Sequence, residues 1–274
     1  MNYKIIALDI DGTLVSSHHN ILPETKEALM EAQKRGLKVV LASGRPTPGM
    51  TALAQALQLE KFGGFVLSYN GGCLTNMKTG ETIHEVFLTP EEAHEIYDFA
   101  KENKVNMVAY DGGEIITDGD DEYIQIEATL NQMSLRKTDD FKKAVVNHTV
   151  KALTTGAPER IAEIEKHYIR KFGHRFSICR SMPFFLEVMP QGINKAASLG
   201  RLLKTLDVTP AEMIACGDGF NDIEMIKYAG LGVAMGNAVD EVKAVADYVT
   251  KSNDENGIAH VIKTFIFKKG VVES

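Results

Sequence analysis

The sequence predicts an α/β protein: a parallel sheet flanked by helices, with an α+β domain inserted into it. Three observations lead to this prediction. Short apolar runs alternate with amphipathic helix patterns in residues 1–82 and again in residues 190–274. Between them, strand-like pieces surround two long helix patterns instead. The length of 274 residues also exceeds the usual size of one domain. We therefore expect a core made of residues 1–82 and 190–274, and an inserted domain of residues 83–189.

The first core segment alternates between strand and helix patterns. Pro at the start of one helix pattern and Gly36 just past its end are typical helix boundaries. Strand, helix and strand at this spacing predict right-handed crossovers and a parallel sheet. The predicted strands are Tyr3–Leu8, Leu37–Ala42 and Phe65–Ser68, and the predicted helices are Pro23–Arg35 and Thr47–Leu57.

The second core segment repeats this alternation. Its predicted strands are Met213–Gly217, Gly232–Met235 and Tyr248–Thr250, and its predicted helices are Lys195–Leu206, Asp222–Ala229, Val239–Ala246 and Gly257–Phe265. The inserted domain has two amphipathic helix patterns, Pro90–Asn103 and Pro158–Phe172. Its predicted strands are Ile83–Leu88, Asn106–Tyr110, Glu114–Thr117, Lys151–Thr155, Arg175–Cys179 and Phe184–Val188.

Composition and charge exclude several classes of function. Apolar residues are 44% and charged residues 24%, as in ordinary globular proteins. The net charge of −7 argues against general binding to nucleic acid or an anionic membrane. No apolar stretch is long enough for a membrane span. Three widely spaced cysteines and the lack of a signal peptide suit a reducing compartment, so we expect a cytoplasmic protein. The sequence does not indicate an oligomeric state.

Two carboxylates end the first predicted strand. Asp9 and Asp11 follow an apolar run, and Gly12 and Thr13 come next. Burying two nearby carboxylates is costly because each loses its hydration and the two repel each other. In an open parallel sheet, ligands bind beyond the carboxyl ends of the strands. The pair therefore predicts a site at this edge of the sheet.

The strand Met213–Gly217 ends in a second acidic motif, GDGFND, which supplies Asp218, Asn221 and Asp222. If this strand lies beside the first, four carboxylates converge. Such a cluster requires a divalent cation, and all-oxygen ligands favour Mg²⁺. Asp222 alone could equally be a helix-start residue stabilised by the helix dipole.

Two further motifs could hold a phosphate group. Ser43 and Gly44 follow the strand Leu37–Ala42, where a hydroxyl and free N–H groups can bind phosphate oxygens. Lys195 begins a helix and could neutralise a phosphate and a carboxylate together. Each motif also has a plain structural interpretation, as a turn or a solvated lysine. Asn70–Gly72 predicts only a turn.

The ordered series DIDGT, SGR, a lone Lys and GDGFND resembles the haloacid dehalogenase-like (HAD) phosphatases. The long interval between the second and third motifs is similar to the Cof-type subgroup of sugar-phosphate phosphatases, which carry a large α/β cap. The resemblance implies a Rossmann-like parallel-sheet core with an inserted α+β cap domain.

The resemblance also implies residue roles. Asp9 would be the nucleophile that forms an aspartyl-phosphate, and Asp11 the general acid and base. Phosphate would be bound by Ile10, Ser43, Gly44, Lys195 and Asn221. Mg²⁺ would be bound by Asp9, Asp11 (through its backbone carbonyl), Asp218 and Asp222, the last close by or through water.

The leading hypothesis is therefore a Mg²⁺-dependent phosphatase of small phosphorylated metabolites, with sugar phosphates as the expected substrates. The alternative is a phosphotransferase or phosphomutase, which forms the same intermediate but uses a hydroxyl acceptor. A third interpretation, a regulatory or binding protein with a vestigial site, is disfavoured because Asp9, Asp11, Lys195 and Asp218 are all present. Two segments, Tyr110–Gly113 and Arg180–Phe185, are candidates for substrate contact.

Overall fold

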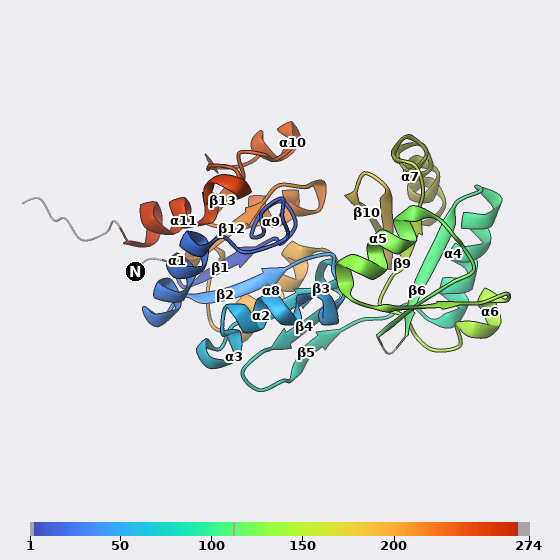
Figure 1. The fold of residues 1–274 in the computed structure, drawn as a ribbon, viewed down its shortest axis with the longest axis horizontal. Coiled ribbons are helices and arrows are strands. Elements are labelled where there is room, and N and C mark those ends of the chain that lie inside the picture. The colour runs from blue at the N-terminus through green and yellow to red at the C-terminus, as the bar shows by residue number, and fades with distance from the viewer. Residues whose placement is uncertain (1–2, 112, 268–274) are drawn as a thin grey trace, which may run out of the picture.

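The computed structural model describes residues 3–111 and 113–267, which form two lobes, each built on its own sheet (Figure 1). We call residues 3–85 and 191–267 the core lobe and residues 86–190 the cap lobe. In the core sheet the strand order is β14-β13-β12-β1-β2-β3-β4-β5, and in the cap sheet it is β10-β11-β9-β6-β7-β8.

The core sheet is parallel from β14 to β3, which confirms the predicted fold class. β4 and β5 extend it as antiparallel strands. The four residues of β1 are all buried, as an apolar run with helices on both faces requires. The strands are β1 (Ile5–Leu8), β2 (Lys38–Ala42), β3 (Phe65–Ser68), β4 (Cys73–Asn76), β5 (Thr82–Glu85), β12 (Met213–Gly217), β13 (Leu231–Ala234) and β14 (Tyr248–Val249).

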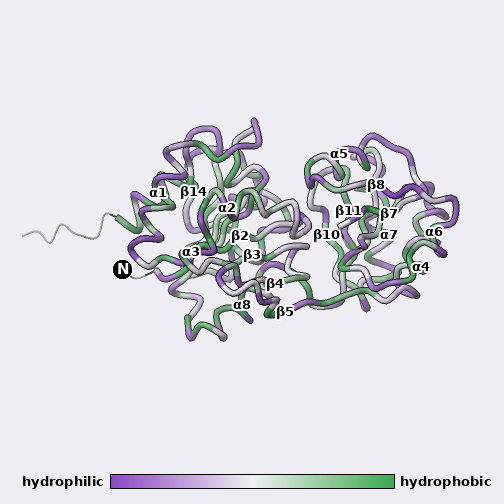
Figure 2. Tube along the Cα trace, turned by 60° about the horizontal axis from the view of Figure 1, so that its bottom comes forward, coloured by the Kyte–Doolittle hydropathy of each residue, from purple (hydrophilic) through white to green (hydrophobic). Residues whose placement is uncertain are grey.

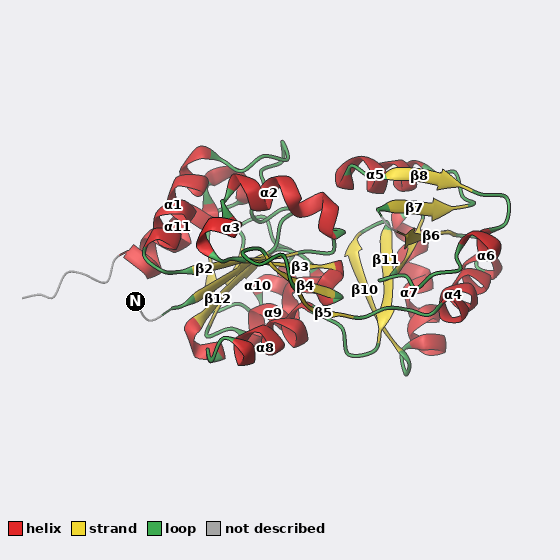
Figure 3. Cartoon of the chain, turned by 90° about the horizontal axis from the view of Figure 1, so that it is seen from below, coloured by secondary structure: helices red, strands yellow, loops and turns green. Residues whose placement is uncertain are grey.

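Helices cover both faces of the core sheet (Figure 3). Ile6 and Leu8 of β1 pack with α1, α2 and α11 on one face, whereas Ile5 and Ala7 pack with α8 and α9 on the other. The alternation of side chains along a strand explains this division. The helices are α1 (Pro23–Lys34), α2 (Thr51–Ala56), α3 (Leu59–Phe62), α8 (Lys195–Thr205), α9 (Ile223–Tyr228), α10 (Asp240–Lys243) and α11 (Gly257–Val261). Shorter turns are the 3-10 helices η1 (Thr47–Met50), η2 (Tyr69–Gly71), η3 (Pro210–Glu212), η4 (Phe220–Asp222) and η5 (Asn253–Glu255), and the π-helical η6 (Ile262–Phe267).

The cap lobe has a core of its own, and both lobes show interior hydrophobic segments in Figure 2. One face of its sheet packs against α4, α6 and α7. Its strands are β6 (Asn106–Asp111), β7 (Glu114–Thr117), β8 (Ser134–Lys137), β9 (Ala152–Thr155), β10 (Phe176–Met182) and β11 (Phe185–Pro190), and its helices are α4 (Pro90–Glu102), α5 (Glu122–Asn131), α6 (Phe141–Ala144) and α7 (Pro158–Phe172).

The other face of the cap sheet lies against the core lobe. Here Tyr69 and Cys73 of the core belong to one apolar cluster with cap residues of β6, α5 and β11. The rings of Tyr69 and Tyr110 meet edge to face, with centroids 6.0 Å apart. The cap therefore covers the carboxyl edge of the core sheet.

The first crossing between lobes differs from the predicted one. The sequence placed residue 83 in the inserted domain, but β5 pairs with β4 through residues 82–85 and completes the core sheet. The apolar run Ile83–Leu88 misled the prediction because a core edge strand and a cap strand look alike in sequence. Among the α-helices and strands, those that were not predicted are α3, β4, α5, β8 and α6. Within the described residues, no helix is long and apolar enough to cross a membrane.

Candidate active site

The predicted motifs meet at one edge of the core sheet. β1 lies between β2 and β12, and Leu8 is level with Leu41 and with Cys216. The residues that follow these three strands therefore emerge side by side. The backbone N–H of Asp9 donates to the carbonyl of Cys216 at 3.0 Å, which holds the two acidic strand ends together. This confirms that strands from opposite ends of the chain are neighbours.

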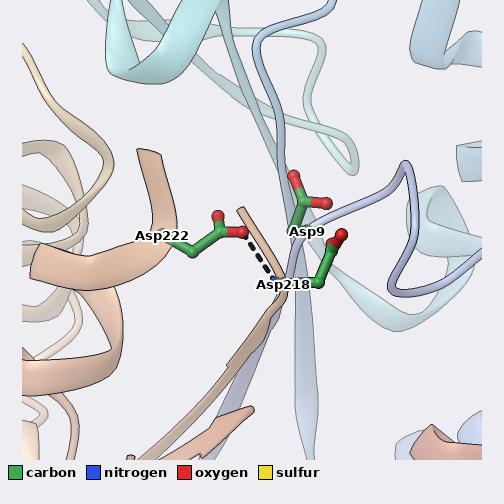
Figure 4. Close-up of side chains that lie close together, drawn as sticks. All are labelled: Asp9, Asp218 and Asp222. Atoms are coloured by element: carbon green, nitrogen blue, oxygen red, sulfur yellow. Dashed lines mark hydrogen bonds between the residues drawn. The ribbon is translucent and has the colours of Figure 1, made fainter. Parts of the chain in front are cut away.

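Three carboxylates converge at this edge. Asp9, Asp218 and Asp222 each offer an oxygen, and these three oxygens lie within 4.8 Å of one another (Figure 4). Gly12 has a φ of +82°, and a Cβ at this position would collide with the Asp218 carboxylate. Thr13 Oγ1 donates to Asp218 Oδ1 at 2.7 Å. The DGT turn thus shapes one side of the carboxylate cluster.

Lys195 lies beneath the cluster and is fully buried. Its Nζ donates to Asp9 Oδ1 at 2.6 Å and to Asp222 Oδ1 at 2.7 Å. The side chain of Asn194 caps α8 by accepting from the N–H of Ala197, and thereby starts the helix at Lys195. Burial lowers the pKa of Lys195, but attraction to Asp222 and Asp9 outweighs this, so its pKa is raised and it is a cation at neutral pH.

Lys195 does not fully balance the charge of the three carboxylates. Burial and repulsion from Asp222 raise the pKa of Asp9 well above its ordinary value, even though Lys195 lowers it. Burial and Asp222 also raise the pKa of Asp218 to about 7. The all-oxygen donor set and the uncompensated negative charge fit a hard divalent cation, because a second cation would favour the ionised carboxylates.

Asp222 has both carboxylate oxygens occupied. Oδ1 accepts from Lys195, and Oδ2 accepts from the backbone N–H groups of Asp218 and Gly219, at 2.9 and 3.0 Å. Figure 4 shows the hydrogen bond from the backbone N–H of Asp218 to Asp222. Asp222 therefore fixes both the lysine and the loop that carries Asp218.

Asp11 lies apart from the carboxylate cluster. Its two oxygens accept from Arg45, at 2.7 Å from Nε and 2.6 Å from Nη2. Arg45 also donates to the carbonyl of Gly49 at 3.2 Å. Arg45 is the last residue of the SGR motif. No role was predicted for this arginine, and the structure shows it as the partner of Asp11.

The motif residues surround one cavity of about 420 Å³ between the lobes. Lys195 lies behind Asp9 rather than in the cavity wall, and the side chain of Ile10 is buried in the core. The predicted residues that do line the cavity are Asp9, Asp11, Ser43, Gly44, Asp218, Asn221 and Asp222.

The cap lobe supplies the rest of the cavity wall. Of the predicted segment Arg180–Phe185, all but Phe184 line the cavity. In the other segment, Tyr110 lies behind the wall and its hydroxyl donates to Glu127 at 2.6 Å, whereas residue 112 is outside the described residues. Three charged cap residues in the wall were not predicted: Glu127, Lys151 and Glu187. A usable signal existed for Glu187, because it is a charge inside an otherwise apolar strand pattern, whereas Lys151 only begins the predicted strand Lys151–Thr155.

Asn70 is a further residue whose position was not predicted. Its φ of 53° agrees with the predicted turn. Its side chain, however, is buried and accepts at Oδ1 from Asn221 Nδ2 at 2.8 Å. A turn prediction from an Asn-Gly-Gly run carries no information about this contact.

Comparison with known proteins places the chain in a family. The profile described as haloacid dehalogenase-like hydrolase matches residues 6–262. YxeH of Bacillus subtilis (strain 168) is 34% identical over 271 residues, which cover 97% of this chain and 100% of YxeH. The 5-amino-6-(5-phospho-D-ribitylamino)uracil phosphatase YcsE of the same organism is 31% identical over 268 residues, covering 97% of each chain.

Solved structures agree with this placement. A haloacid dehalogenase-like hydrolase from Bacteroides thetaiotaomicron is 44% identical, with a TM-score of 0.87 over 96% of this chain and 99% of the other. A structure titled as the HAD subclass IIB sugar phosphatase BT4131 is 30% identical, with a TM-score of 0.84 over 96% and 98% of the two chains. The family predicted from the motif series is thus confirmed: the chain belongs to the haloacid dehalogenase-like hydrolases.

Proposed function

We propose that this chain is a Mg²⁺-dependent phosphatase that hydrolyses small phosphorylated metabolites through an aspartyl-phosphate on Asp9. One observation carries the proposal: the Asp9 carboxylate lies at the cavity between Lys195 and Asp218, with Asp11 two residues away in the same cavity wall. Phosphate monoester hydrolysis requires a nucleophile, cations that offset the charge of the phosphate dianion, and an acid that protonates the leaving group.

The metal would be held by Asp9, Asp218 and the backbone carbonyl of Asp11, with Asp222 close by. Bound there, Mg²⁺ would reduce the repulsion between the Asp9 carboxylate and the phosphate oxygens. The raised pKa values of Asp9 and Asp218 support this assignment.

In the first proposed step, an Asp9 oxygen attacks phosphorus, and the bond from phosphorus to the leaving oxygen breaks. Asp11 gives its proton to that oxygen. In the second step, Asp11 takes a proton from the attacking water, the bond from phosphorus to Asp9 breaks, and inorganic phosphate leaves. Each Asp11 oxygen accepts from Arg45 and keeps a further lone pair for these proton transfers.

The phosphate group would be bound by donors around Asp9. We assign this role to the Ser43 hydroxyl, the backbone N–H groups of Ile10 and Gly44, and the Asn221 amide. Lys195 would add positive charge from beneath. Ser43, Gly44 and Asn221 line the same cavity as Asp9, which supports the assignment.

We propose sugar phosphates as the substrate class. The cap wall presents hydrogen-bonding side chains, Glu127 and Arg180, beside the apolar Phe185, which suits a compact hydroxyl-bearing leaving group. The names of two relatives also support this class, because one is a sugar phosphatase and the other acts on a phosphorylated ribityl compound.

We also propose three broader features of the chain. It would belong to the Cof-type subgroup, it would divide into a core domain and an inserted cap domain, and it would be located in the cytoplasm. The separate apolar clusters of the two lobes support the domain division. The described cysteines, all free thiols, are compatible with a reducing compartment.

A screen for phosphate release tests the proposed function. The protein with Mg²⁺ is incubated with nitrophenyl phosphate and a panel of phosphorylated metabolites, without any acceptor besides water. We expect phosphate release from nitrophenyl phosphate and from several sugar phosphates. Turnover that needs an added hydroxyl acceptor would indicate the phosphotransferase or phosphomutase instead, and no metal-dependent turnover of any substrate would contradict both.

A further inference from the structure

A buried ion pair of the cap lobe lies directly on the core loops at the active site. Lys151 Nζ donates to Glu187 Oε1 at 2.9 Å, and each residue is only 1% exposed. Lys151 immediately precedes β9, and Glu187 lies in β11, the neighbouring strand. Burying an ion pair costs free energy because both charges lose their hydration. A protein in which apolar residues of similar size replace such a pair is often equally stable. Stability alone is therefore a weak explanation for this pair.

Each member of the pair has a partner in the core lobe. Lys151 Nζ donates to the carbonyl of Gly44 at 2.8 Å, and Glu187 Oε2 accepts from Asn70 Nδ2 at 2.6 Å. A Cβ at Gly44 would lie 2.9 Å from Glu187 Oε1, which is closer than real Cβ contacts come. The cap pair and the Gly44 loop are thus fitted to each other.

These contacts continue to the groups that we assign to phosphate binding. Asn70 Oδ1 accepts from Asn221 Nδ2 at 2.8 Å, so Glu187 reaches Asn221 through one side chain. The backbone N–H of Asn70 donates to the carbonyl of Ser43 at 2.9 Å. The peptide group before Gly44 is therefore held by Asn70, and the one after it by Lys151.

We propose that Lys151 and Glu187 are positioning residues: from the cap, they orient the Gly44 loop and Asn221 so that both can bind the phosphate group of the substrate. This inference rests on the proposed function, because it concerns the same phosphate site. Its chemical consequence is specific. The pair acts at the phosphate end of the substrate, so its loss weakens every phosphate ester alike, whatever the leaving group.

The test uses three variants of the full chain. Glu187→Gln keeps the size of the side chain but removes its charge. The double variant Lys151→Met/Glu187→Leu removes both charges of the pair together, so neither member is left buried without the other. Lys142→Met is the matched control, because Lys142 is an exposed cap lysine and neither it nor its ion-pair partner Asp98 lines the cavity. Circular dichroism and thermal melting show whether each variant is folded.

Two readouts are measured with Mg²⁺ present: kcat/KM for nitrophenyl phosphate and for the best sugar phosphate, and the calorimetric Kd of inorganic phosphate. We expect Glu187→Gln and the double variant to lose kcat/KM by the same factor on both substrates, about 10- to 100-fold. The Kd of inorganic phosphate should rise in the same two variants. Lys142→Met should have the same kcat/KM and the same phosphate Kd as the parent. Because Glu187 and Asn221 are linked through Asn70, the effects of Glu187→Gln and Asn221→Ala should be less than additive.

A folded double variant with an unchanged phosphate Kd would overturn the inference and leave the proposed function intact. So would a loss confined to the sugar phosphate, because that pattern indicates contact with the leaving group. If the parent itself releases no phosphate, the proposed function fails, and the calorimetric comparison alone decides the inference.

Discussion

Arg45 binds Asp11 through two hydrogen bonds, from Nε to Oδ2 at 2.7 Å and from Nη2 to Oδ1 at 2.6 Å. A guanidinium holds a carboxylate by this two-point contact in one orientation, which a single hydrogen bond cannot do. Asp11 is the residue that we assign to proton transfer, and it lies beyond the end of β1, in an isolated bridge with Val15 outside the sheet. Its orientation therefore depends on Arg45.

The first prediction concerns this contact. Arg45→Lys keeps the positive charge but loses the two-point geometry, so Asp11 should be free to rotate. We expect kcat/KM for a sugar phosphate to fall by about 10- to 100-fold, toward the range typical of lost acid–base help. Arg35→Lys, at an exposed arginine paired with Glu31, is the control. Equal activity of the Arg45→Lys protein and the parent would show that Arg45 does not position Asp11.

The second prediction concerns the metal. EDTA should abolish phosphate release, and Mg²⁺ should restore it. Asp218→Ala should weaken calorimetric Mg²⁺ binding strongly. Thr13→Val removes only the 2.7 Å hydrogen bond to Asp218 and keeps the side-chain shape. It should weaken Mg²⁺ binding by about 10-fold, which is the smaller end of the effects seen when a residue that hydrogen-bonds to a metal ligand is replaced. Full turnover by the metal-stripped parent would exclude the assignment.

The third prediction concerns Glu127 and pH. Burial raises the pKa of this carboxyl group, and Lys151 and Tyr110 offset only part of the rise. The folded state therefore binds more protons than the unfolded state between the ordinary and the raised pKa, so stability falls as pH rises through that interval. Glu127→Gln removes the titration and still offers an acceptor to Tyr110.

The free energy of unfolding, measured with urea at pH 4.5 and pH 8, tests this. The stability of Glu127→Gln relative to the parent should be higher at pH 8 than at pH 4.5, by about 1.4 kcal/mol for each unit by which the pKa is raised. A relative stability that is the same at both pH values would show that Glu127 does not titrate differently on folding.

The position of the core motifs could be predicted because each follows a buried strand directly. β1, β2 and β12 end level with one another, so DIDGT, SGR and GDGFND meet by topology alone. In a parallel sheet, a polar motif that directly follows an apolar strand lies at the carboxyl edge. Motifs that follow different strands therefore share this edge. The carboxylate cluster of Asp9, Asp218 and Asp222 follows from the same arrangement.

The cap side of the cavity could not be predicted, because its contacts join residues far apart in the chain. The helix α5 was not predicted because Ile124 and Ile126 alternate as in a strand. The helix also shows no single apolar stripe, since its Glu127 faces the cavity. Glu187 finds its partners 36 and 117 residues away, in Lys151 and Asn70. Local sequence patterns contain no information about such pairings.

The last prediction separates the two aspartates of the DIDGT motif. Asp9→Asn should remove the nucleophile, so no labelled phosphate should become attached to the protein with any substrate. Asp11→Asn should still form the intermediate when the leaving group needs no proton. A sugar alkoxide is a poor leaving group and needs one, so that substrate should lose rate in the first step, by about 10²–10⁴-fold.

Nitrophenolate leaves without a proton, so transfer of its phosphoryl group to Asp9 should be far less affected in Asp11→Asn. The intermediate then persists, because the asparagine cannot take a proton from the attacking water. The variant should therefore release a burst of nitrophenol followed by slow turnover, and labelled phosphate should accumulate on the protein. Equal slowing of both substrates without a burst would remove the acid–base role from Asp11. Its carboxylate would then serve the site only through the contact with Arg45.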